Sequence, residues 1–145
     1  MNAEEWLEQI KWLDERINAK LAEREQLMAL ATKVTPSMDG MPHGGGVTDK
    51  VGNIAVKLTT LAEETNALVD QYVDQRREVI KALEQLPNNE YTVLHKHYVQ
   101  FRTWESIADE MDISAMTVWR YKVSGLKNLS RVMECYIVPM VQYKL

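Results

Sequence analysis

The sequence predicts an all-α fold in which a long, coiled-coil-like helical hairpin precedes a C-terminal helix-turn-helix domain. Apolar residues recur every three or four positions over most of the chain. Two prolines and four glycines fall in one segment, Thr32–Thr48, which can reverse the chain between two helices. A short, capped and basic helical pattern then follows. We therefore expect a hairpin over residues 1–85, a helix-turn-helix domain over 86–133 and an apolar tail over 134–145.

The hairpin is expected to consist of two helices with apolar stripes. The first helix covers about Ala3–Ala31, and Lys20 and Arg24 interrupt its stripe. Its apolar positions are Trp6, Ile10, Leu13, Ile17, Leu21 and Met28. The second helix begins near Val51 and alternates steps of three and four, which is typical of a coiled-coil seam. The seam positions that we expect to mediate oligomerisation are Val51, Ile54, Leu58, Leu61, Leu68 and Tyr72.

A two-helix hairpin covers only one stripe on each helix, so the pattern favours a homodimer or a higher homo-oligomer. The alternative is that the C-terminal domain of the same chain covers the seam. The loop over 32–48 lacks the Lys-Ser/Thr of a nucleotide-binding loop. Asp39 and His43 either contact a partner there or belong to a surface linker.

The basic segment predicts three helices. Pro87 stops the preceding helix, so that Asn88 or Asn89 caps the first of the three. Thr103 and Ser114 are suitable N-caps for the second and third. The positions that we expect to face the core are Tyr91, Leu94, Tyr98, Trp104, Ile107, Ala108, Met111, Val118, Tyr121 or the stem of Lys122, Gly125 or Leu126, and Leu129.

The charge distribution favours DNA as the partner of the last helix. Residues 1–85 carry a net charge of −5 and residues 86–145 carry +1, which together give −4. Between Ile113 and Met133 every charged residue is a cation. These cations are Arg120, Lys122, Lys127 and Arg131. Such a patch suits contact with phosphates, and the alternative is the solvated face of an ordinary helix.

The direction of the last helix assigns candidate roles to individual residues, since its N-terminal turns would enter the major groove. Arg120 is the best candidate reader because its guanidinium can bond to guanine through two nitrogens. Trp119 either contacts DNA or completes the core. The candidate base contacts are Ala115, Met116, Trp119 and Arg120. The candidate phosphate contacts are Arg102, Ser114, Thr117, Lys122 and Lys127.

The same segment resembles the fourth region of bacterial sigma factors, and more closely the sigma-like regulators of phages and prophages of Gram-positive bacteria, including the ArpU/RinA-type late-gene regulators. The matching residues are Leu86, Pro87, Glu90, Val93, Leu94, Tyr98, Ile107, Ala108, Ile113, Ser114, Val118, Leu126 and Leu129. The resemblance implies a sigma-like helix-turn-helix that acts with host RNA polymerase. Sigma factors usually place polar residues where this chain has Ala115, Met116 and Trp119, which favours a dedicated phage site over an ordinary promoter.

Composition argues against several other classes of protein. The apolar content of 46% is enough for a core without metals, cofactors or disulfides, and Cys135 has no second cysteine to pair with. His95 and His97 lie two apart on a helix and point in different directions, so no metal site is expected. No nucleophile stands at a suggestive distance from a base, which argues against an enzyme. Without a signal peptide or apolar span, we expect a cytoplasmic protein with no membrane partner.

These patterns together predict a DNA-binding transcriptional regulator of phage type. The hairpin would hold two recognition helices at a fixed spacing on double-stranded DNA, and polymerase contact near a late-gene promoter is implied by the resemblance alone. Two alternatives remain at this stage. One is a DNA-packaging protein similar to a small terminase subunit, which would form a ring. The other is a helical adaptor that does not bind DNA.

Overall fold

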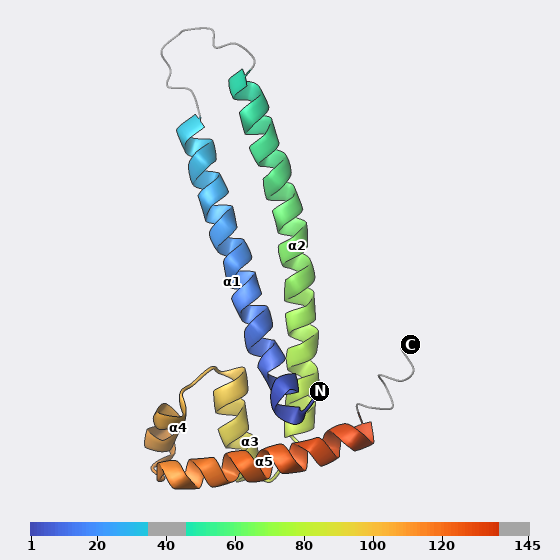
Figure 1. The fold of residues 1–145 in the computed structure, drawn as a ribbon, viewed down its shortest axis with the longest axis vertical. Coiled ribbons are helices and arrows are strands. Elements are labelled where there is room, and N and C mark those ends of the chain that lie inside the picture. The colour runs from blue at the N-terminus through green and yellow to red at the C-terminus, as the bar shows by residue number, and fades with distance from the viewer. Residues whose placement is uncertain (35–45, 137–145) are drawn as a thin grey trace. The chain divides into compact units, whose positions relative to one another are not determined.

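The computed structural model describes residues 1–34 and 46–136, and all regular secondary structure in these two segments is helical. The helices are α1 (Ala3–Val34), α2 (Gly46–Leu83), α3 (Asn88–Leu94), the π-helix η1 (His95–Val99), α4 (Trp104–Met111) and α5 (Ala115–Tyr136) (Figure 1). The predicted all-α fold is confirmed. The expected contacts of Asp39 and His43 and the apolar tail from residue 137 onward lie outside the described residues.

The chain forms two compact units that do not divide at residue 85. The head unit comprises residues 1–12 together with the chain from residue 72 onward, and the hairpin unit comprises residues 13–71. The first turns of α1 and the last turns of α2 therefore belong with α3, η1, α4 and α5. This division follows from where apolar side chains are buried, since both ends of the long helices contribute to the head core.

The head unit has two clusters of buried side chains. The larger cluster joins α1 and α2 to the helices that follow them. Its buried members are Ala3, Trp6, Leu7, Ile10, Val79, Ala82, Leu83, Leu86, Leu94, Tyr98, Val99 and Leu129. The smaller cluster consists of Val93, Ile107, Ala108 and Val118 and joins α3, α4 and α5. The α5 positions expected to face inward are confirmed, because Val118 and Leu129 are fully buried and Gly125 is buried between them.

Helix α3 begins without the predicted side-chain cap. Pro87 occupies the N-cap position with no side-chain cap hydrogen bond, so the prediction of a cap by Asn88 or Asn89 was wrong. Both asparagines lie inside the helix, because Pro87, with φ of −53° and ψ of 150°, has the extended backbone of an N-cap residue and the helix begins directly after it. The helix continues into η1, where the Gln100 amide donates to the His95 carbonyl, five residues back.

The packing of α5 on α3 includes one buried carboxylate. Glu90 on α3 is only 7% exposed. Its two oxygens accept hydrogen bonds from the Ser124 hydroxyl and from the Asn128 amide, the latter at 2.8 Å. Charge-assisted bonds of this kind are stronger than neutral ones and offset the cost of burying the carboxylate. The Glu90 carboxylate therefore fixes the register of α5 against α3.

Glu90→Ala is expected to lower the free energy of unfolding by roughly 1–3 kcal/mol, because the half-buried Asn128 amide loses its acceptor. Urea unfolding followed by circular dichroism would measure this change. Glu90→Gln is the matched control, since it keeps the shape and one acceptor oxygen, and it should cost less. Equal stability of the alanine variant and the wild type would contradict a structural role for this carboxylate.

The hairpin unit pairs α1 and α2 as antiparallel neighbours (Figure 1). Of the six predicted seam residues, Leu61 is buried, and Ile54, Leu58 and Leu68 are half-buried. Since the described part of this unit contains only two helices, α1 of the same chain covers them. Tyr72 instead packs against the head core, and Val51 is exposed. The described seam residues are thus covered by α1 of the same chain and not by the C-terminal domain, and homo-oligomerisation stays a prediction.

The predicted stripe on α1 was wrong at two positions. Leu21 and Met28 are exposed, whereas Lys20 and Leu27 are half-buried. Lys20 occupies the seam because its aliphatic stem can pack there while its amine reaches the Glu64 carboxylate on α2 at 2.7 Å. A polar residue at a seam position can fix the register of two paired helices, and Lys20 has this role between α1 and α2.

Candidate nucleic-acid interface

Helices α4 and α5 form a helix-turn-helix whose two N-termini are capped as the sequence predicts. The Thr103 hydroxyl accepts a hydrogen bond from the Ser106 amide at 3.2 Å and starts α4. Asp112 ends α4 in the left-handed conformation, with φ of 55°. The Ser114 hydroxyl accepts from the Thr117 amide at 3.1 Å and starts α5. Because the turn between the helices has only three residues, the start of α5 is held close to the end of α4.

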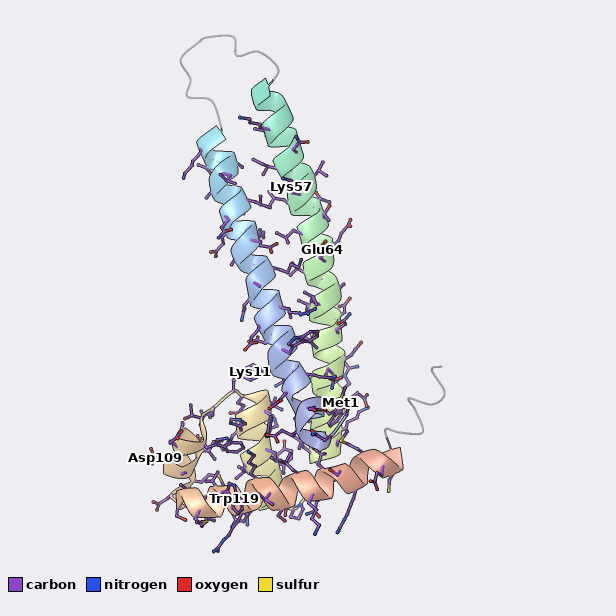
Figure 2. The ribbon with its side chains drawn as sticks, in the orientation of Figure 1. Met1, Lys11, Lys57, Glu64, Asp109 and Trp119 are labelled. Atoms are coloured by element: carbon purple, nitrogen blue, oxygen red, sulfur yellow. The ribbon has the colours of Figure 1, made fainter. Side chains whose placement is uncertain are left out.

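The N-terminal half of α5 has a buried face and an exposed one. Val118 faces the small cluster of the head unit and is 1% exposed. Met116 and Trp119 are 59% and 57% exposed, and Figure 2 labels Trp119 in this part of the helix. Trp119 therefore does not complete the core, which answers the question that the sequence left open. An exposed indole beside an exposed thioether forms an apolar patch that is typical of a binding surface.

The two other predicted base contacts and one predicted phosphate contact are also exposed on α5. Ala115, Arg120 and Lys127 all lie in the exposed class. Within the described residues, neither Arg120 nor Lys127 makes an ion pair, so both cations are available to an anionic partner. Ser114 is exposed too, although its hydroxyl already shares a hydrogen bond of 2.9 Å with the hydroxyl of the half-buried Thr117.

The remaining two predicted phosphate contacts have acidic partners inside the head unit. Arg102 forms an ion pair with Glu110 on α4, and Lys96 binds the other oxygen of the same carboxylate at 2.8 Å. Lys122 lies 3.6 Å from a Glu4 oxygen. Ion pairs between partly exposed side chains contribute little free energy, so these acidic partners hold Arg102 and Lys122 only weakly.

A stack of side chains holds the C-terminal end of η1 against α4. The rings of His97 and Trp104 are parallel within 15° at 3.7 Å, and the Lys122 amine lies 5.1 Å from the centre of the Trp104 ring. The His97 Nδ1 donates to the Arg102 carbonyl at 2.7 Å. The Tyr98 hydroxyl donates to Glu4, and burial together with this carboxylate raises the pKa of Tyr98. The stack therefore positions the loop that leads into α4.

No sequence pattern indicated this stack, since its members are widely spaced along the chain and come from three helices. Glu90 is among the residues that match the sigma-like regulators, but its burial could not be predicted because its partners, Ser124 and Asn128, lie 34 and 38 residues further along the chain. The described residues contain no group of His, Cys, Asp and Glu that could hold a metal ion. None of the helices in the two described segments combines the length and hydropathy of a membrane span.

The head unit should lose stability as the pH falls through the range in which histidine titrates. Burial lowers the pKa of His97 despite the hydrogen bond to the Arg102 carbonyl, and nearby Lys122 lowers it further. Burial also lowers the pKa of His95, with a contribution from Arg76. The unfolded chain thus binds protons at a higher pH than the folded one, and stability is lost as the pH falls below about 6.5.

Urea midpoints at neutral pH and at mildly acidic pH would measure this loss. His97→Phe keeps a ring on Trp104 and cannot titrate, so its midpoint should fall less with acidification than that of the wild type. An identical pH dependence in the two proteins would show that His97 does not contribute.

The fold and this surface together define an all-α protein with a helix-turn-helix whose second helix presents an exposed, partly basic face. The chain belongs to the family described as "Protein of unknown function (DUF1492)", whose model matches residues 33–130. The match covers more than half of the chain and includes α3, η1, α4 and most of α5. No curated protein and no solved structure matches the chain. The description of the family names no activity or ligand.

Proposed function

We propose that this protein is a sequence-specific, double-stranded DNA-binding transcriptional regulator of phage type. The observation that carries the proposal is the exposed face at the start of α5. Met116, Trp119 and Arg120 face outward there, while Val118 anchors the same turns in the core. The N-terminal residues of the second helix are the ones that helix-turn-helix proteins place against base edges.

The proposed roles follow from the chemistry of each side chain. Arg120 reads a guanine through its two-pronged guanidinium. Ala115, Met116 and Trp119 contact the methyl groups of thymines, which explains why exposed apolar surface occurs beside a cation. Ser114, Thr117 and Lys127 contact phosphates, and the amides at the start of α5 add to them. Arg102 and Lys122 join when phosphate displaces Glu110 and Glu4.

The biological setting in this proposal is a phage or prophage late-gene promoter in the cytoplasm of a bacterial host. Contact with host RNA polymerase is part of the proposal, and it is supported by the resemblance of residues 86–129 to sigma-like regulators. The acidic overall charge does not oppose DNA binding, since the net charge of residues 86–145 is +1.

One observation favours a second candidate function, that of a protein adaptor. Val123 is 45% exposed and lies one and two helical turns beyond Trp119 and Met116, so an apolar strip continues along α5. Such a strip also suits a partner helix laid against it. In that case α5 would bind protein, and selective DNA affinity would be absent.

The two candidates are separated by binding of the purified protein to fragments of its own neighbouring genome, with random DNA as competitor, over a salt series. We expect selective binding that weakens as salt rises, because neutralised phosphates release counterions. Selective binding would also give the operator sequence. Absence of selectivity at physiological salt would contradict the regulator and support the adaptor.

A further inference from the structure

The hairpin unit has a second apolar surface in addition to its seam. On α2, Ala55, Ala62 and Val69 each follow a seam residue by one position, and all three are exposed. On α1, Leu21 and Met28 follow the seam positions Lys20 and Leu27 in the same way. Together with Val51, we call these six residues the lateral face. The four larger side chains, Leu21, Met28, Val51 and Val69, are between 37% and 48% exposed.

The residues of the lateral face lie on one side of the hairpin. One step along an α-helix turns the side chain by about 100°. Because α1 and α2 are antiparallel, the residue that follows a seam position points to the same side of the helix pair on both helices. The five exposed residues that follow seam positions therefore line up beside each other, and Val51 continues the line at the start of α2.

The two sides of the hairpin differ in charge. Along α2 the lateral face also includes Thr59 and Asn66, so that no charged residue lies in its stripe from Val51 to Val69. The Thr59 hydroxyl already donates to the Ala55 carbonyl at 3.0 Å, so its burial leaves no unpaired group.

The opposite side of the hairpin has charged residues on both helices. The residues that precede seam positions there include Lys57 and Glu64 on α2, both labelled in Figure 2, and Arg16 and Glu23 on α1. The opposite side also exposes Leu30, but of the two sides of the described hairpin the lateral face is the more apolar and the less charged, as is typical of a covered surface.

A second copy of the same chain is the occupant that fits this face. A two-fold contact places each residue near its own counterpart, and an uncharged stripe meets itself without bringing like charges together. The acidic residues closest to the face are Glu63 and Asp70, one turn beyond Thr59 and Asn66 on α2, and the half-buried Asp14, which follows the seam residue Leu13 on α1. None of the three lies in the uncharged stripe of α2 itself. At 1.5 Å per residue the stripe on α2 is about 27 Å long, and α1 roughly doubles its width. Two such faces bury on the order of 1,000 Å² in total, which is enough for a specific interface.

We propose that the protein dimerises through the lateral face, with α2 of one copy packed on α2 of the other, so that two hairpins make a four-helix bundle. Of the residues predicted from the sequence to mediate oligomerisation, Ile54, Leu58, Leu61 and Leu68 pack against α1 within each copy, whereas Val51 belongs to the lateral face. This dimer goes beyond the proposed function, since it forms with or without DNA.

The test is sedimentation equilibrium of the full chain without DNA. The wild type should have twice the mass of the 16.8 kDa chain at micromolar concentration. Ala62→Glu places a charge at the centre of the face and should raise the dissociation constant about 100-fold or more, because an unpaired charge is costly to bury. Val69→Glu should have the same effect. Both positions are exposed in the single chain, so circular dichroism should show unchanged helix content.

Ala67→Glu is the matched control, because Ala67 is exposed on the opposite side of α2 and receives the same substitution. It should leave the dimer intact. A monomeric wild type, a ring of many copies, or dissociation caused by Ala67→Glu and not by Ala62→Glu would each overturn the proposal. Failure of the DNA-binding proposal would leave this result unchanged, since the mass is measured without DNA.

Discussion

Arg120→Ala is expected to weaken binding to the specific site by about 1–3 kcal/mol, which is roughly 5-fold to 150-fold in the dissociation constant. The reason is that the exposed guanidinium of Arg120, which has no ion pair among the described residues, is placed to bond to guanine through two nitrogens. Binding to random DNA should change much less. Discrimination should be relaxed at one base position of the site, which a selection from randomised sites would reveal.

Lys127→Ala is the control for this prediction, because Lys127 is also exposed on α5 but lies two turns further along. It should weaken binding to all sequences about equally and reduce the slope of the salt dependence by about one. Equal losses on specific and random DNA for Arg120→Ala would remove Arg120 from the readers and leave it as a phosphate contact.

Gly125→Val is expected to lower the free energy of unfolding of the head unit by about 1–3 kcal/mol. A Cβ at Gly125 would lie 2.8 Å from the Leu94 Cδ1 and 3.3 Å from the Glu90 Cβ, so α3 and α5 would have to move apart. Leu94 is fully buried and has little room to give way. Urea unfolding followed by tryptophan fluorescence would report the loss, since Trp6 and Trp104 belong to the head unit.

Gly52→Val is the matched substitution in a helix interior. A Cβ at Gly52 would have no heavy atom within 4 Å, so only the helix propensity changes there, and stability should rise by a few tenths of a kcal/mol. If both substitutions had the same effect, the close approach of α5 to α3 at Gly125 would be refuted.

Most features set by neighbours in the sequence could be predicted, with the N-cap of α3 as the exception, and those set by distant residues could not. The caps Thr103 and Ser114 were predicted correctly because a cap depends on a side chain and an amide three residues apart. The positions of α5 that face the core could be predicted from the helical spacing of its apolar residues. In contrast, the assignment of residues 1–12 to the head unit depends on packing against residues more than sixty positions away.

The errors on the hairpin have a similar origin. The exposure of Leu21 follows from the ion pair that lets Lys20 occupy the seam, and the partner in that pair, Glu64, lies 44 residues along the chain. At the candidate site, the α5 residues could be predicted from the sequence. Their exposure and the acidic partners of Arg102 and Lys122 could be found only in the structure. The DNA-contacting roles themselves stay predictions.

The order of the two units along the chain affects how the protein folds during its synthesis. Trp6, Leu7 and Ile10 leave the ribosome well before the buried residues of their cluster that begin at Val79. Closing a long loop is slow when the intervening chain is disordered. Residues 13–71 can pair as a hairpin while synthesis continues, which shortens the effective loop before the head closes. The hairpin thus acts as a folding aid for the head unit, whose sequence flanks it on both sides.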